Sequence, residues 1–111
     1  MLNPNMPEPE FLKSLLEPLL EDFQYWFGRS RSLLETESIP FLGVEGQAQL
    51  HIRVQQAIEE VNTAKMLFQA TGGQVGLEME VLVTWHKLLT ECWQVAMRFR
   101  AERSPSPELG K

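Results

Sequence analysis

The sequence lacks several features that mark common classes of protein. Its single cysteine cannot form an internal disulfide bond, which fits a reducing compartment. Lysine and arginine total 10 against 15 aspartate and glutamate residues, and the net charge of −5 argues against general binding to nucleic acid phosphates. No apolar run approaches the roughly 18–20 residues of a membrane span. Residues 1–8 also lack the basic and apolar regions of a secretory signal. These absences predict a cytoplasmic protein, and peripheral contact with a membrane stays open.

Strict alternation of apolar and polar residues is also missing, which makes a β-sheet improbable. What is present is a hydrophobic fraction of 43% in 111 residues, enough for one folded domain. Apolar residues recur at spacings of three and four in three segments, at about 9–37, 45–70 and 74–103. Short connections favour antiparallel neighbours. The sequence therefore predicts an all-α protein, an antiparallel up-down-up three-helix bundle.

Each segment carries an apolar row that would face the core. In the first segment the main row is Leu12, Leu16, Leu19, Phe23, Trp26, Ser30 and Leu33, and a second row is Leu15, Leu20, Phe27 and Leu34. In the second it is Leu50, Val54, Ala57, Val61, Ala64 and Phe68. In the third it is Leu82, Trp85, Leu89, Cys92, Ala96 and Phe99, flanked by Val81, Leu88 and Val95.

Proline and glycine mark the boundaries of these segments. Because the first row continues in phase across Pro18, we expect a kink there rather than a break. The connector at 38–43 is apolar, and its Ile39, Phe41 and Leu42 are expected to cover one end of the core. Glycine after Thr71 is expected to end the second helix in a left-handed cap. The domain is predicted to span 1–103, followed by a disordered Ser/Pro tail at 104–111.

Residues that could support catalysis or metal binding are few and scattered. His51, His86 and Cys92 do not form a CxxC, HExxH or Glu-x-x-His pattern, so no metal site and no cofactor are predicted. The histidines are expected at surface or boundary positions, and Cys92 as a small buried hydrophobe. The glycine-rich residues 72–76 follow a helix rather than a strand, which favours a turn over a phosphate-binding loop. No nucleophile lies beside a base, and no catalytic residue is predicted.

Residues 23–32 are the most informative stretch, because four aromatic residues fall within five positions. At 100° per residue, Tyr25 points away from the face shared by its aromatic neighbours and lies near Arg29. An exposed tyrosine beside arginine is typical of a protein interface. The alternative is a wide core face with one incidental surface tyrosine. Arg31 could meet an acidic partner or pair with Glu35.

A second cluster of positive charge lies at the end of the third segment. Arg98, Arg100 and Arg103 match the negative end of a helix dipole, which explains them without a ligand. The alternative is a contact with an acidic protein or lipid headgroups. The candidate partner-binding residues are therefore Tyr25, Arg29, Arg31, Arg98 and Arg100.

The aromatic residues also support a different hypothesis. A pocket for a tetrapyrrole, quinone or lipid could be lined by Phe23, Trp26, Trp85, Trp93 and Phe99. Packing of these side chains in the core is the simpler interpretation of their spacing. Carriage of a hydrophobic ligand is kept as the alternative to a protein-binding role.

Three runs carry a resemblance to a known family. They are residues 15–27 (LLEPLLEDFQYWF), 68–76 (FQATGGQVG) and 85–99 (WHKLLTECWQVAMRF). Together they resemble a family of small cyanobacterial proteins, domain of unknown function 2605. The resemblance implies a cyanobacterial source and, by association with that lineage, a role at photosynthetic complexes beside the thylakoid. It supplies no catalytic or binding residues. We expect a non-enzymatic accessory protein that docks on a protein partner or on itself.

Overall fold

The computed structural model describes residues 8–72 and 78–103. The helix α1 spans Glu8–Thr36, the short 3-10 helix η1 spans Pro40–Leu42, α2 spans Gly43–Ala70 and α3 spans Met79–Arg103. No strand occurs within these two ranges. The prediction of an all-α protein is confirmed.

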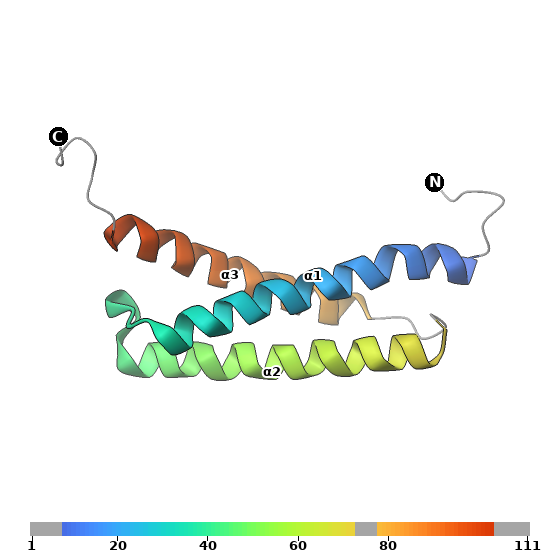
Figure 1. Cartoon of the computed structure of the whole chain (residues 1–111), viewed down its shortest axis with the longest axis horizontal. Coiled ribbons are helices and arrows are strands. Elements are labelled where there is room, and N and C mark those ends of the chain that lie inside the picture. Colours follow the sequence, from blue (N-terminus) through green and yellow to red (C-terminus); the bar gives the residue numbers. More distant parts are fainter. Residues whose placement is uncertain (1–7, 73–77, 104–111) are drawn as a thin grey trace.

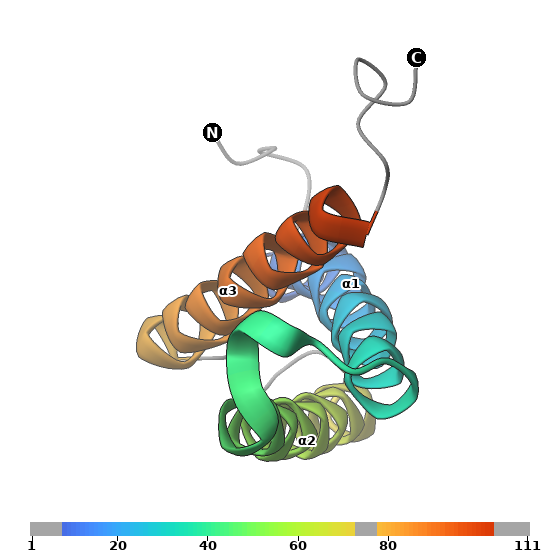
Figure 2. The same ribbon diagram turned by 90° about the vertical axis from the view of Figure 1, so that its left-hand side faces the viewer.

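The three helices run up, down and up, as predicted. Figure 1 shows α1 and α3 running in the same direction while α2 returns between them along the chain. Viewed end-on in Figure 2, the helices occupy the corners of a triangle. The closest packing is between α1 and α2, whereas α3 crosses the bundle obliquely. One side of α1 is therefore covered more completely than the other.

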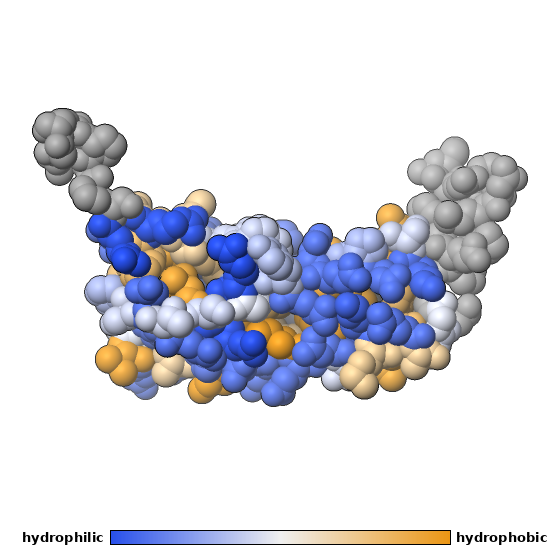
Figure 3. All heavy atoms as spheres, viewed as in Figure 1, coloured by the Kyte–Doolittle hydropathy of each residue, from blue (hydrophilic) through white to orange (hydrophobic). Residues whose placement is uncertain are grey.

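A single hydrophobic core joins the three helices. The predicted row of α2 is buried apart from Ala64, which is half-buried. Most of the row in α3 is buried too, and the largest of these side chains, Trp85, is 2% exposed. Outside the core the face seen in Figure 3 is mostly hydrophilic, with apolar atoms in separate patches. A period of three and four residues therefore identified the inner faces of both helices correctly.

The inner face of α1 differs from its predicted main row. The buried side chains are Leu20, Phe23, Phe27 and Leu34, which belong mostly to the predicted second row. Leu19 and Trp26 of the main row are 36% and 37% exposed. The reason is the oblique course of α3, which leaves one flank of α1 without a close neighbour. The helix continues through Pro18 without ending, so the chain does not break there, as predicted.

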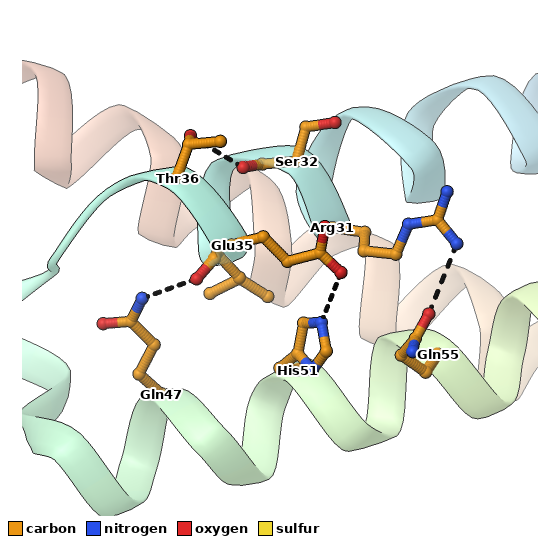
Figure 4. Close-up of polar contacts among 8 residues, drawn as sticks. Arg31, Ser32, Glu35, Thr36, Gln47, His51 and Gln55 are labelled. Atoms are coloured by element: carbon orange, nitrogen blue, oxygen red, sulfur yellow. Dashed lines mark hydrogen bonds and ion pairs between the residues drawn. The ribbon is translucent and has the colours of Figure 1, made fainter.

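The connector between α1 and α2 is organised by one glutamine. The side chain of Gln47 donates hydrogen bonds from Nε2 to the carbonyl oxygens of Leu34 (2.8 Å) and Glu37 (2.7 Å), and its Oε1 accepts the N–H of Ile39 at 2.9 Å. Carbonyl groups at a helix end lack partners within the helix. Figure 4 shows Gln47 reaching up from α2 to the end of α1. Ile39 is buried, as predicted for the connector.

The structure describes only the two ends of the connection between α2 and α3, residues 71–72 and residue 78. The N–H of Thr71 bonds to the carbonyl of Leu67, and Gly72 has a φ of +67°, so the predicted left-handed glycine follows α2. The helix α3 begins at Met79, later than the predicted 74, and Glu78 lies just outside the helix. The carbonyl oxygen of Glu78 accepts the N–H groups of Val81 and Leu82 in the first turn. Residues 73–76 of the predicted turn at 72–76 and the predicted tail at 104–111 fall outside the described residues.

Candidate functional site

An open groove of about 560 Å³ lies between α1 and α3. We call it the α1/α3 groove. Helix α1 contributes Trp26, Arg29, Ser30 and Leu33, and α3 contributes Thr90, Trp93, Gln94, Ala96, Met97 and Arg100. No residue of α2 lines it, and in Figure 2 these two helices meet on the side of the bundle away from α2.

Two of the residues that line the groove are small. Ser30 and Ala96 stand between bulkier neighbours at helical spacing, so their helices approach without filling the space above them. The hydroxyl of Ser30 donates to the carbonyl oxygen of Trp26 at 2.9 Å, which keeps that polar group satisfied. The walls are then formed by the large side chains one turn away on each helix.

Two tryptophans from different helices meet in this groove. The rings of Trp26 and Trp93 are 5.9 Å apart and nearly perpendicular, at 88°. Tyr25 packs edge-on against Trp26, with ring centres 4.9 Å apart. Edge-to-face pairs of this kind are favourable. All three rings nevertheless keep much of their surface in water: Tyr25 is 54% exposed, and the tryptophans 37% and 39%.

Arg29 adds a positive charge to this aromatic cluster. Its Nη1 donates to the hydroxyl of Tyr25 at 3.1 Å. Its guanidinium carbon lies 5.8 Å from the centre of the Tyr25 ring and 6.0 Å from that of Trp26, within cation–π range. The predicted pairing of Tyr25 and Arg29 is therefore present, and the structure adds Trp26 to it.

The other predicted partner-binding arginines are divided. Arg100 lines the α1/α3 groove seven positions after Trp93 on the same helix. Arg31 instead turns toward α2 and donates to Gln55 at 3.3 Å, while Glu35 pairs with His51 at 2.8 Å (Figure 4). The structure therefore does not form the alternative pair of Arg31 with Glu35.

The remaining two arginines of α3 are used within the molecule. Arg98 pairs with Glu102 at 2.8 Å and lies over the ring of Phe41, 4.1 Å from its centre. Arg103 reaches Glu37 beyond the end of α1, at 3.5 Å. Both side chains are engaged at the connector end of the bundle.

In the described part of the chain, the five aromatic residues of the predicted ligand pocket are divided between the core and the α1/α3 groove. Phe23, Trp85 and Phe99 are buried in the core, where the rings of Phe23 and Trp85 pack edge to face at 5.4 Å. The indole N–H of Trp85 donates to Glu60 at 3.0 Å. Only Trp26 and Trp93 reach the groove, so their open surface is the part of that hypothesis that retains a structural basis.

The histidines and the cysteine lie apart from one another. His51 is half-buried beside Glu35, and His86 is exposed. Cys92 is buried, and burial raises the pKa of its thiol, although a hydrogen bond with Ser30 acts in the opposite direction. Within residues 8–72 and 78–103, no three His, Cys, Asp or Glu side chains are grouped to hold a metal ion.

Sequence reasoning missed part of this groove. It identified Tyr25, Arg29, Arg100 and the two tryptophans, but assigned them to separate hypotheses. Met97 was not considered, although it is 58% exposed beside Trp93. One feature of the sequence could have indicated a groove: in α1 the small Ser30 interrupts a row of bulky residues.

Comparison with known families assigns this chain to one of them. The model of the family described as Protein of unknown function (DUF2605) matches residues 6–101. The chain belongs to this family. The match includes every residue of the α1/α3 groove, so the groove lies within the family domain. No curated protein and no solved structure matches the chain. None of the described helices is long and apolar enough to cross a membrane.

Proposed function

We propose that this member of the family is a non-enzymatic accessory protein that binds a protein partner through the α1/α3 groove and the adjoining Tyr25. The observation that carries the proposal is the pair Trp26 and Trp93, which keep more than a third of their surface in water. Apolar surface removed from water contributes about 25 cal/mol per Å². A partner that covers these rings would gain that contribution.

The composition of the groove supports a protein partner. Tryptophan, tyrosine, methionine and arginine are enriched at protein interfaces. Tryptophan, tyrosine and arginine also dominate their binding energy. All four types gather here, in Trp93, Tyr25, Met97, Arg29 and Arg100. Aromatic residues lose little conformational freedom when bound, because few of their bonds rotate. The tryptophans and Tyr25 therefore offer rigid anchors.

The test removes two exposed side chains, Arg29, which lines the groove, and Tyr25, which adjoins it. The double variant Tyr25→Ala and Arg29→Ala should keep the circular dichroism spectrum of the native protein, because both side chains are exposed. It should lose the partners that the native protein retains on affinity purification from the source organism, identified by mass spectrometry. Lys87→Ala, an exposed change on the other side of α3, is the control and should retain them. A double variant that keeps every partner would contradict the proposal.

The groove also favours a second candidate function, carriage of a hydrophobic ligand such as a tetrapyrrole, quinone or lipid. Its volume of about 560 Å³ falls in the range of small-molecule sites, roughly 300–1,000 Å³. Two indole rings could stack on a flat ligand. Purification from the source organism separates the two functions. A visible absorption band or an extractable lipid would support carriage, and a colourless, lipid-free protein would count against it.

The setting of this activity is a proposal based on the family resemblance. We infer a cyanobacterial source, a cytoplasmic location and action beside the thylakoid, with a photosynthetic complex as the larger assembly. Co-purification with such a complex is the expected result. Partners drawn only from unrelated assemblies would contradict it.

A further inference from the structure

We propose that the occupant of the α1/α3 groove is an amphipathic helix of a partner protein, with large apolar anchors flanked by carboxylates. This inference rests on the proposed function and specifies the chemistry of the partner. The anchors would cover Trp26 and Trp93. The carboxylates would meet Arg29 and Arg100 at the edges of the groove.

The shape of the groove favours a helix. Because α1 and α3 run in the same general direction, their lining side chains form two ridges, one on each side of the groove. The ridge on α1 runs from Trp26 to Leu33, and the ridge on α3 from Thr90 to Arg100. Seven residues of helix extend about 10 Å. A third helix laid along two ridges presents apolar residues at spacings of three, four and seven, which match this length.

The charges of the groove favour an acidic partner. Its ten lining residues include two arginines and, among those described, no aspartate or glutamate, although the whole chain has a net charge of −5. Arg53, Arg98 and Arg103 each pair with a glutamate of this chain. Arg29 and Arg100 have no acidic partner among the described residues. A carboxylate of the binding partner would form an ion pair with each of these guanidinium groups.

The same charges argue against a second copy of this chain. In a symmetric dimer the same patch faces itself. Two grooves placed face to face would bring four arginine side chains together without a carboxylate of either groove, and like charges at an interface are unfavourable. An acidic helix from a different protein avoids this repulsion.

The experiment selects the occupant without assuming its sequence. A displayed library of 16-residue helical peptides is randomised on the face that would contact the groove. It is selected for binding to the full chain at moderate salt. The expected winners carry aromatic or large aliphatic residues at spacings of three, four and seven, with Glu or Asp beside them. Winners with Lys or Arg in those flanking positions, or with no helical spacing, would overturn the inference.

Three variants then test the assignment of the contacts, using the best selected peptide. Arg29→Glu and Arg100→Glu should each weaken binding about fivefold to tenfold, as expected for charges at the edge of an interface. Lys87→Glu is the control: it makes the same change in net charge outside the groove and should leave the affinity within about twofold. Equal losses of affinity for all three variants would mean that the peptide responds only to the net charge of the protein, and would overturn the assigned contacts.

Two further results separate failure of this inference from failure of the proposed function. If Trp93→Ala abolishes binding of peptides that lack acidic residues, the groove binds protein but the acidic assignment is wrong. If no peptide binds in a manner sensitive to Trp93→Ala, both proposals fail. Sedimentation of the chain alone is expected to show a monomer. A dimer disrupted by Arg100→Glu, or Arg100-dependent binding to vesicles of anionic lipid, would place a different occupant in the groove.

Discussion

The two flanks of α1 differ in how completely they are closed. Toward α2, its buried side chains meet a continuous apolar row. Gln24 adds polar contacts between the two helices, because it donates to Asn62 at 2.7 Å and accepts from Lys65 at 3.0 Å. Toward α3, the buried edge-to-face pair of Phe23 and Trp85 is joined by a second edge-to-face pair, Trp26 and Trp93, which stays partly open to solvent. The first flank stabilises the fold, and the second leaves aromatic surface for another molecule.

The largest expected effect that tests this comparison is loss of a core ring of α1. Phe27 is fully buried, so Phe27→Ala should lower the free energy of unfolding by about 3–5 kcal/mol. Met97→Ala, on the open flank, removes a side chain that is 58% exposed and should cost no more than about 0.5 kcal/mol. Urea unfolding followed by circular dichroism measures both. Similar losses for the two variants would show that the flanks do not differ in this way.

An intermediate effect is expected at the connector. Gln47→Ala would leave two carbonyl groups and one N–H without the partner they now share, at a cost of about 1–3 kcal/mol. Gln49→Ala, an exposed glutamine two positions along the same helix, is the matched control and should be close to neutral. Thermal unfolding of the two variants provides the comparison. Equal stability would mean that water replaces Gln47 without loss.

The smallest effect concerns the core directly beneath the groove. Burial raises the pKa of the Cys92 thiol, so folding should keep it protonated where an exposed cysteine ionises. Because the folded state holds this proton more tightly, the stability contributed by Cys92 is complete below the ordinary cysteine pKa of about 8.5 and falls as the pH rises above it.

The measurement is the free energy of unfolding between pH 7 and pH 10 for the native protein and for Cys92→Ala. The difference between the two curves should be flat at neutral pH and should fall in the alkaline range. The thiol should also react slowly with a disulfide reagent at pH 8. Rapid modification of the folded protein would show that water reaches the core through the groove.

Much of the fold could be predicted from sequence because two helices have only one buried face. In α2, residues from Leu50 to Phe68 repeat at spacings of four and three, and the same row forms the core. In α1 the prediction was less accurate, because Leu19 and Trp26 share an apolar flank with buried residues. Which part of that flank is covered depends on the crossing of α3, and no local spacing encodes that crossing.

The candidate site could be predicted only in pieces. An aromatic and arginine-rich stretch identified Tyr25 and Arg29, but their proximity to Trp93 requires the tertiary arrangement of two helices. Arg31 shows the limit clearly, since it lies two residues from Arg29 yet bonds to Gln55 of α2. Gln47 carried no sequence signal, because its three bonds are to backbone groups of a connector whose path was unknown.

The parallel course of α1 and α3 has an electrostatic consequence at the connector end. Two helices finish there together, so the partial negative charges of both termini are concentrated in one place. The last turn of α1 contains no basic residue, whereas that of α3 contains Arg100 and Arg103. By reaching Glu37, just past the end of its neighbour, Arg103 supplies cationic charge to a terminus that has none of its own. In an antiparallel pair, the negative end of one helix would lie beside the positive end of the other, and no counter-charge would have to be shared in this way.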